Sequence, residues 1–289
     1  MFQSQVITRT RPFLRHEVSE SPGPHQACTE IGQNGKQVSV RGTNETFGFH
    51  ASYPDSAPLS SIWKSHVHPL LETTLRGQNT ALVSYGAASA GKSFVLDGEP
   101  QQPGLVPLSL EAFSRYMESQ PEGTVTMTVS AFLVQADESV VDIMQRDPVK
   151  RGHLKGRVLT DPAMLRRGVL VDGIDAIQVT SREEAMQLLR SAQEQNSWSN
   201  AHRVVLATIE HWAPPSAPEH RSGEPLLSGT MLMTETATPA PGSNPDWIGA
   251  LQGVMCALEA RQPRVEYSRS KITQLLKETW SGVMPTTFI

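Results

Sequence analysis

Cysteine is scarce in this chain of 289 residues, which contains only Cys28 and Cys256. The two lie far apart in the sequence, and neither belongs to a Cys-x-x-Cys pair or to a Cys/His cluster. Disulfide-stapled secreted domains and cysteine-ligated zinc sites need such clusters. The cysteine pattern therefore indicates two reduced thiols in an intracellular protein.

Long apolar runs and an excess of charge of one sign are also missing. No apolar stretch approaches membrane-spanning length, and the N-terminus lacks a basic segment followed by an apolar one, so we expect neither a signal peptide nor a membrane anchor. The 25 Lys and Arg against 29 Asp and Glu leave a net charge of −4, which does not favour nucleic acid as a partner. The sequence thus predicts a soluble, cytoplasmic protein.

The pattern of apolar residues predicts alternating strands and helices. With 38% hydrophobic and 19% charged residues, the composition is that of a globular protein. Strand-like segments are residues 6–12, 37–40, 79–85, 125–134, 204–209 and 286–289, with a strand pair or turn at 168–179. Helical periodicity covers residues 59–75, 105–117, 246–260 and 270–279, and Ser181 with Glu184 forms a capping-box start for one more helix. This alternation favours an α/β sandwich with a buried central sheet.

One motif carries recognisable chemistry. Residues 86–93 match the pattern G-x-x-x-x-G-K-[ST] at every defined position, and they lie between an expected strand and an expected helix. Glycines let the loop curl so that its N–H groups face phosphate oxygens, the lysine reaches the β- and γ-phosphates, and the serine hydroxyl holds Mg²⁺. The residues expected to hold the phosphates are Gly86, Ala87, Ala88, Ser89, Ala90, Gly91, Lys92 and Ser93, with Ser93 as the metal ligand.

The sequence around this loop resembles the kinesin motor-domain signature GxNxxxxxYGxxxxGK[ST], which residues 77–93 match. Further segments resemble motifs of the same family in the same order along the chain. These are residues 9–12 (RxRP), 47–54 (FxFDxxF, with His50 in place of the aspartate), 67–70 (VxPL), 267–276 (YRDSKLTxLL) and the strand at 286–289. The resemblance covers nearly the whole chain and is far more specific than the P-loop alone.

The resemblance implies a three-layer P-loop NTPase fold of the kinesin type, with a central, mostly parallel sheet and helices on both faces. It implies ATP with Mg²⁺ as the ligand and the microtubule as the partner. By the same resemblance, Arg9, Arg11, Pro12 and Phe94 flank the adenine, where an aromatic ring and a guanidinium plane suit a flat base. The alternative for Phe94 is a core aromatic residue on the P-loop helix.

Two motifs that kinesins use to sense the γ-phosphate, NxxSSRSH and DxxGxE, are degenerate in this chain. Residues 196–202 keep asparagine, serine and His202 but lack the arginine, and His202 alone is more typical of a surface loop. After the strand near residues 231–233, Glu235 could replace the metal-supporting aspartate, but residues 234–239 contain no glycine and Pro239 has no N–H to offer. Binding without efficient hydrolysis is therefore expected.

The region expected to face the filament is also reduced. The stretch between Glu235 and the helix near Ala250 is shorter than the family pattern by about one helix of ordinary length. A cationic cluster survives, which the acidic microtubule surface would attract, although a solvated helix face is an equal alternative. Its members are Arg264, Arg269, Lys271 and Lys277. His66 and His68 suggest no metal site, because no third ligand is evident.

We therefore expect a single kinesin-like motor domain over residues 1–289, lacking neck linker, coiled coil and tail, and monomeric. The expected function is ATP binding at the P-loop, with hydrolysis and motility impaired, in the cytoplasm and on the cytoskeleton. The alternative is an active microtubule-stimulated motor ATPase that drives microtubule-based movement. A third interpretation is a truncated or mis-spliced gene product, whose short segments reflect skipped or mis-predicted exons.

Overall fold

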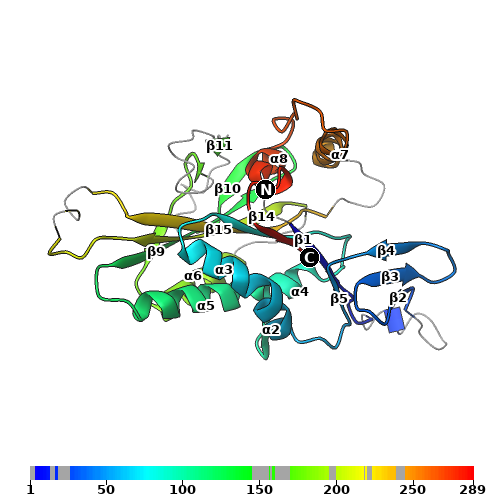
Figure 1. The fold of residues 1–289 in the computed structure, drawn as a ribbon, viewed down its shortest axis with the longest axis horizontal. Coiled ribbons are helices and arrows are strands. Elements are labelled where there is room, and N and C mark those ends of the chain that lie inside the picture. The colour runs from blue at the N-terminus through cyan, green and yellow to red at the C-terminus, as the bar shows by residue number, and fades with distance from the viewer. Residues whose placement is uncertain are drawn as a thin grey trace.

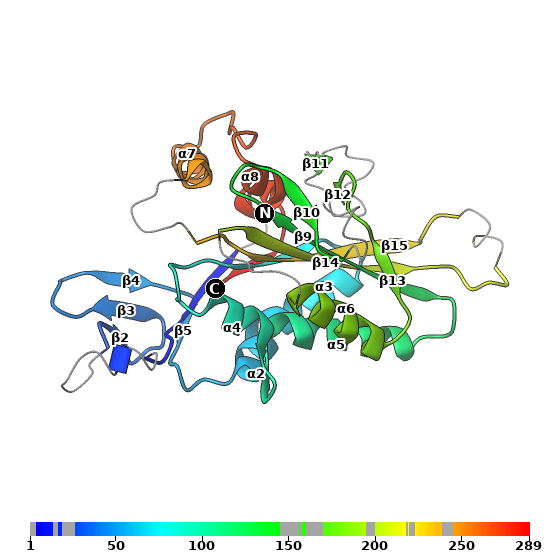
Figure 2. The ribbon, with the colours of Figure 1, turned by 180° about the vertical axis from the view of Figure 1, so that it is seen from behind.

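The computed structural model describes residues 4–13, 17–18, 27–144, 156, 158–159, 170–194, 200–217, 219, 223–238 and 245–289. Within them a central sheet lies between two sets of helices (Figures 1 and 2). None of the helices in these ranges is long and apolar enough to cross a membrane. Cys28 and Cys256 are exposed and form no disulfide.

The central sheet is mixed. Its strands run in the order β10-β9-β14-β15-β6-β16-β1-β5, and β13 also pairs with β9. From β15 to β5 all neighbours are parallel, whereas β14, β9, β10 and β13 pair antiparallel. The strands are β1 (Gln5–Arg9), β5 (Ala51–Tyr53), β6 (Thr80–Ser84), β9 (Val125–Val134), β10 (Val140–Asp142), β13 (Ile177–Val179), β14 (His202–His211), β15 (Leu227–Glu235) and β16 (Thr286–Phe288).

Helices cover both faces of this sheet, which confirms the expected α/β class. Figure 1 shows one group on one face and the other group opposite it. The first group is α2 (Leu59–Ile62), the π-helical turn η1 (Trp63–Val67), α3 (His68–Leu75), α4 (Lys92–Asp97), α5 (Leu105–Glu118) and α6 (Arg182–Glu194). The second is α7 (Asp246–Glu259), α8 (Lys271–Leu275) and α9 (Lys277–Trp280).

The two helical layers bury two separate cores, and strand β14 contributes to both. Its Val205 and Ile209 pack with the α2–α6 layer, whereas Val204 and Leu206 pack with α7 and α8. Neighbouring strand residues point to opposite faces, so a strand buried on both sides reads as a continuous apolar run. This is why residues 204–209 show little polar alternation.

Three small sheets lie outside the central one. Strands β2 (Thr29–Ile31), β3 (Gln37–Val40) and β4 (Thr46–Gly48) form an antiparallel sheet that extends from one end of the molecule (Figure 1). The other two are the hairpin β7 (Gly98–Glu99) with β8 (Gln102–Pro103) and the pair β11 (Val158–Leu159) with β12 (Leu170–Val171).

The single helix expected over residues 270–279 is wrong in one respect, because the structure has two short helices that break at Leu276. Sequence reasoning also missed what starts α8. The carboxylate of Glu138, in the turn between β9 and β10, accepts hydrogen bonds from Ser270 Oγ (2.8 Å) and from the backbone N–H of Lys271. A distant carboxylate thus takes the place of a local N-cap.

The capping box expected at Ser181 is present with a small difference. Ser181 Oγ accepts a hydrogen bond from the N–H of Glu184 (3.2 Å), as the motif requires. The Glu184 carboxylate accepts a hydrogen bond from the N–H of Thr180 at 2.8 Å, whereas the motif would use the N–H of Ser181, one residue later.

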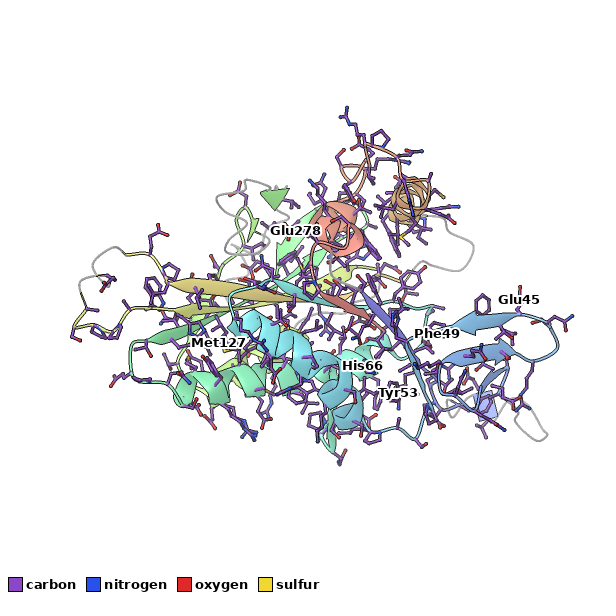
Figure 3. All side chains as sticks on the ribbon, in the orientation of Figure 1. Glu45, Phe49, Tyr53, His66, Met127 and Glu278 are labelled. Carbon is purple, nitrogen blue, oxygen red and sulfur yellow. The ribbon has the colours of Figure 1, made fainter. Side chains whose placement is uncertain are left out.

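His66 has a structural role in the first helical layer. Its ring nitrogens lie 2.8 Å from the Tyr53 hydroxyl and 2.7 Å from Gln5 Oε1, and Figure 3 shows the side chains of His66 and Tyr53 near each other. His66 therefore joins η1 to β1 and to the edge strand β5. Both ring nitrogens are engaged by protein groups.

Candidate functional site

The loop of residues 86–91 connects the fully buried strand β6 to helix α4. Gly91, the N-cap of α4, has φ 93°, a conformation that glycine adopts without strain. Ser89 also has a positive φ of 54°. At Gly86 a Cβ would lie 3.1 Å from the Ala90 Cβ, so the loop folds closely upon itself. The geometry agrees with the tight turn that the motif predicts.

Lys92 is folded back onto this loop. Its Nζ donates hydrogen bonds to the carbonyl oxygens of Gly86 (2.8 Å) and Ala87 (3.0 Å) and to Thr238 Oγ1 (2.7 Å). Burial lowers the pKa of Lys92, and the nearby charge of Glu235 partly opposes this shift. These acceptors hold the ammonium at the base of the loop. Phosphate oxygens could take the place of the two carbonyl oxygens as its hydrogen-bond acceptors.

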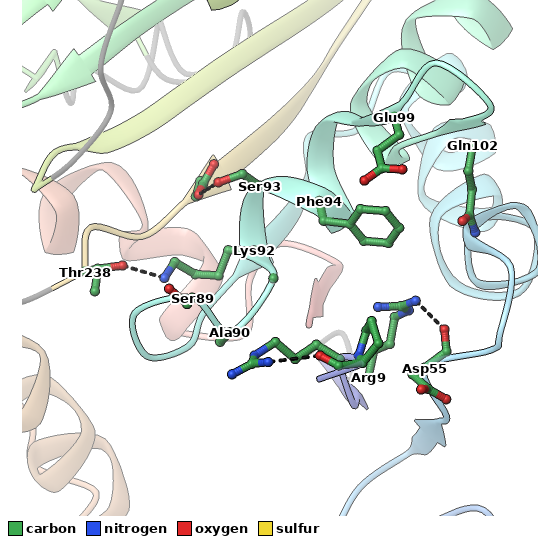
Figure 4. A pocket seen from close by; sticks show the side chains of 14 residues that line it. Arg9, Asp55, Ser89, Ala90, Lys92, Ser93, Phe94, Glu99, Gln102 and Thr238 are labelled. Atoms are coloured by element: carbon green, nitrogen blue, oxygen red, sulfur yellow. Dashed lines mark hydrogen bonds between the residues drawn. The ribbon is translucent and has the colours of Figure 1, made fainter. Parts of the chain in front are cut away.

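A cavity of about 660 Å³ opens beside the loop (Figure 4). Nine of the twelve predicted site residues line it: Arg9, Arg11, Pro12, Ser89, Ala90, Gly91, Lys92, Ser93 and Phe94. Gly86, Ala87 and Ala88 do not line it, since they form the half of the loop next to β6. The cavity also includes Asp55, Glu99, Gln102 and Thr238, which sequence reasoning missed, and Glu235, which it weighed.

Arg9 and Phe94 form a pair across the cavity. The guanidinium carbon of Arg9 lies 5.0 Å from the centre of the Phe94 ring, and its Nη2 donates to the carbonyl oxygen of Asp55 at 2.6 Å. Burial lowers the pKa of Arg9. Phe94 also packs on the core beneath it, which agrees with the alternative interpretation of this residue, while its role toward adenine stays a prediction. Arg11 instead forms an ion pair with Glu17, with contacts of 2.7 and 2.5 Å.

Ser93 and Glu235 are the groups that would face a metal ion. Ser93 Oγ donates to Glu235 Oε1 at 2.6 Å, and Glu235 is the last residue of β15, not part of the following loop. Mg²⁺ needs only one or two protein oxygens beside phosphates and water. The exposed Ser93 hydroxyl with a carboxylate directly behind it fits that requirement.

His202 is not a surface residue, so that expectation is wrong. It is the first residue of β14 and only 3% exposed. Its Nδ1 accepts a hydrogen bond from the N–H of Ala237 (3.0 Å), and its ring meets Trp247 edge-on with centroids 4.7 Å apart. Apolar surroundings and a backbone donor explain the burial. Residues 196–199 and Pro239, the other parts of the degenerate motifs, lie outside the described residues.

Comparison with known proteins identifies the family. The family model of the kinesin motor domain matches residues 9–204, more than half of the chain. This chain belongs to the kinesin motor domain family. Membership in that family implies use of a nucleotide with Mg²⁺, association with microtubules and a place on the cytoskeleton, all at the level of the family.

Individual kinesin relatives are distant and longer. The human "Kinesin-like protein KIFC2" is 26% identical over 300 residues, which cover 94% of this chain and 34% of that protein. "Kinesin-like protein KIF11-A" of Xenopus laevis is 24% identical over 325 residues (99% and 29%). "Kinesin-like protein klp-19" of Caenorhabditis elegans is 25% identical over 308 residues (99% and 27%). The chain thus spans about a third of the length of these relatives or less.

The cationic cluster is only partly available on the surface of this motor domain. Lys271 is drawn toward the turn at Glu138, where its Nζ contacts the backbone carbonyl oxygen. Arg264, Arg269 and Lys277 are exposed, and Lys277 Nζ lies 5.9 Å from the centre of the Tyr267 ring. Three of the four predicted cations therefore remain in position to meet an acidic surface.

Burial of His202 predicts an acid-sensitive fold. It lowers the pKa of His202 from its ordinary 6.5 to about 3. Between these two pKa values His202 binds a proton in the unfolded chain but not in the native chain. The free energy of unfolding therefore falls as the pH falls below about 6.5. We expect the unfolding free energy from urea titration to drop by about 1 kcal/mol between pH 7 and 5.5 through this group.

The variant His202→Asn isolates this contribution, because an amide oxygen can accept the Ala237 N–H without titrating. His66 and His211, whose pKa values burial also lowers, stay in both proteins and act in the same direction. The variant should be less stable at pH 7 but should lose less stability on acidification. Equal pH slopes in the two proteins would contradict the assignment.

Proposed function

We propose that this kinesin motor domain binds ATP with Mg²⁺ in the cavity beside the P-loop and that its hydrolysis and motility are impaired. The arrangement of the cavity is the observation that carries the binding proposal. Lys92 and Thr238 lie on one side of it, and Arg9 with Phe94 lies on the other (Figure 4). A nucleoside triphosphate has the same polarity, with an anionic phosphate tail at one end and a flat base at the other.

Seven of the residues that line the cavity have a defined role in this proposal. Lys92 exchanges its loop carbonyls for the β- and γ-phosphates, which are stronger acceptors for an ammonium. Phe94 and Arg9 hold the adenine by stacking and by a cation–π contact. Ser93 carries Mg²⁺ with support from Glu235, and Mg²⁺ supplies neutralisation of phosphate charge there. Arg11 and Pro12 border the base from the β1 side.

The impairment follows from the groups around the expected γ-phosphate position. The N–H of Ala237 donates to His202 Nδ1 and so is not offered to a phosphate. The Thr238 hydroxyl accepts from Lys92, and no glycine occurs from Thr234 to that point. Phosphoryl transfer depends on groups that position water and stabilise the transferred phosphoryl. In the described part of the chain, the Ala237 N–H and the Thr238 hydroxyl are engaged by His202 and Lys92, which supports impaired hydrolysis.

The alternative, an active microtubule-stimulated ATPase, is favoured by the exposed cations Arg264, Arg269 and Lys277 beside α8 and α9. We propose the microtubule as partner through this surface, with weakened binding, and residues 1–289 as one monomeric motor-domain unit. Cytoskeletal localisation would follow from that contact.

Two measurements on the wild-type chain test the proposal. Saturating ATP or ADP with Mg²⁺ should stabilise the fold by about 2.7 kcal/mol at a hundred times Kd, seen as a raised Tm. Phosphate release should stay near background with and without microtubules. A Tm that no nucleotide raises would contradict binding, whereas turnover that microtubules stimulate would establish the active alternative.

A further inference from the structure

Arg203 is a buried cation between two carboxylates at the base of the P-loop helix. Its side chain is only 3% exposed. Its Nη1 donates to Asp97 Oδ1 at 2.8 Å, and its Nη2 forms an ion pair with Glu235 Oε2 at 3.2 Å. A guanidinium is always charged and engages two carboxylates without losing its proton.

The three residues come from separate elements. Arg203 is the second residue of β14 and pairs in register with Glu235, which ends β15, while Asp97 ends helix α4. Arg203 therefore ties the P-loop helix to the strand end that supports the metal position. It does not line the cavity itself.

Both oxygens of Glu235 have partners. Oε1 accepts from Ser93 Oγ at 2.6 Å, and Oε2 faces the guanidinium. The carboxylate is thus fixed in position and charge-compensated by protein groups alone. No pairing with Mg²⁺ is needed to hold it.

This compensation matters because the cavity is proposed to receive phosphates. An uncompensated carboxylate behind Ser93 would repel the phosphate tail, and a divalent cation would be needed between them. The guanidinium, which also pairs with Asp97, and the nearby ammonium of Lys92 together offset the charge of Glu235 in a buried, weakly screened position. The repulsion that Mg²⁺ would otherwise relieve is therefore small.

We propose that Arg203 is a positioning residue that neutralises Glu235 without a metal, so that nucleotide binding at this site depends only weakly on Mg²⁺. The inference rests on the proposed nucleotide site. It concerns affinity, so it holds whether or not the bound nucleotide is hydrolysed.

Calorimetric titration of the full chain with ADP, in Mg²⁺ and in EDTA, tests this inference. In the wild type the two Kd values should differ by less than about fivefold, and a larger difference overturns the proposal. In Arg203→Met the ratio of the two Kd values should rise at least about tenfold, because Glu235 becomes an unpaired charge facing the phosphates. The double variant Arg203→Met/Glu235→Gln should return to the wild-type ratio.

Three controls keep the outcome clear. Arg203→Lys retains the charge and should keep the weak dependence on Mg²⁺, and Arg190→Met removes an exposed arginine of α6 and should match the wild type. Should Arg203→Met fail to fold, the wild-type ratio still decides. Absence of ADP binding in both buffers would refute the nucleotide site itself, whereas binding in Mg²⁺ that EDTA abolishes would refute only the role of Arg203.

Discussion

Replacing Lys92 with alanine is expected to weaken ATP binding at least about a hundredfold, since two or more charge-assisted hydrogen bonds to phosphates are lost. In the structure the same ammonium donates hydrogen bonds to two loop carbonyls and to Thr238 Oγ1. Its loss should change the fold little, because the variant also removes the cost of burying a charge. Calorimetric titration with ATP and Mg²⁺ measures the effect directly.

The matched control is Lys64→Ala, which removes an exposed lysine from η1. It should bind ATP as the wild type does. Equal affinity in Lys92→Ala and Lys64→Ala would show that the nucleotide binds elsewhere or not at all. Any microtubule-stimulated turnover in the wild type should likewise disappear in Lys92→Ala.

The second large effect concerns the contact between β15 and α3. A Cβ at Gly229 would lie 2.1 Å from the carbonyl oxygen of Thr74 and 3.2 Å from that of Gln78. Both neighbours are backbone atoms, which cannot rotate away. Gly229→Ala should therefore lower the unfolding free energy by about 3 kcal/mol or more, measured by urea denaturation.

Gly249 offers the opposite case within the same chain. It lies inside α7, and a Cβ there meets nothing within 4 Å. Gly249→Ala should raise the unfolding free energy by about 0.5–1 kcal/mol, through helix propensity and loss of freedom in the unfolded chain. A Gly229→Ala protein with the wild-type midpoint would show that β15 and α3 are not in close contact.

Much of the fold could be predicted because its elements have strong local patterns. The fully buried strand β6, the amphipathic helix α5 and the capping box before α6 all appear where periodicity and capping place them. The helix expected over residues 270–279 is the exception. Its break at Leu276 lets Leu275 and Leu276 both enter the core under α7, and no local signal marks it.

The candidate site likewise contains residues that the sequence predicts and residues that it does not. Residues 86–93 are contiguous, so their motif predicts a loop without knowledge of the rest of the chain. His202 was misjudged because its burial depends on Trp247, which lies 45 positions further along the sequence. Thr238 and Arg203 belong to no recognisable motif. Thr238 nevertheless accepts a hydrogen bond from Lys92, and Arg203 forms an ion pair with Glu235, the carboxylate behind Ser93.

What the sequence alone determined was the α/β class, the P-loop and the resemblance to kinesins, since these depend on short-range spacing and local propensity. Tertiary structure decided which charges lie together. Asp97, Arg203 and Glu235 are separated by more than a hundred positions at the widest, and only the pairing of β14 with β15 beside α4 lets Arg203 donate a hydrogen bond to Asp97 and form an ion pair with Glu235. Burial then sets the strength of these contacts, because a charge shielded from water interacts far more strongly than one on the surface. Neither the burial of these charges nor their proximity can be predicted from the local sequence.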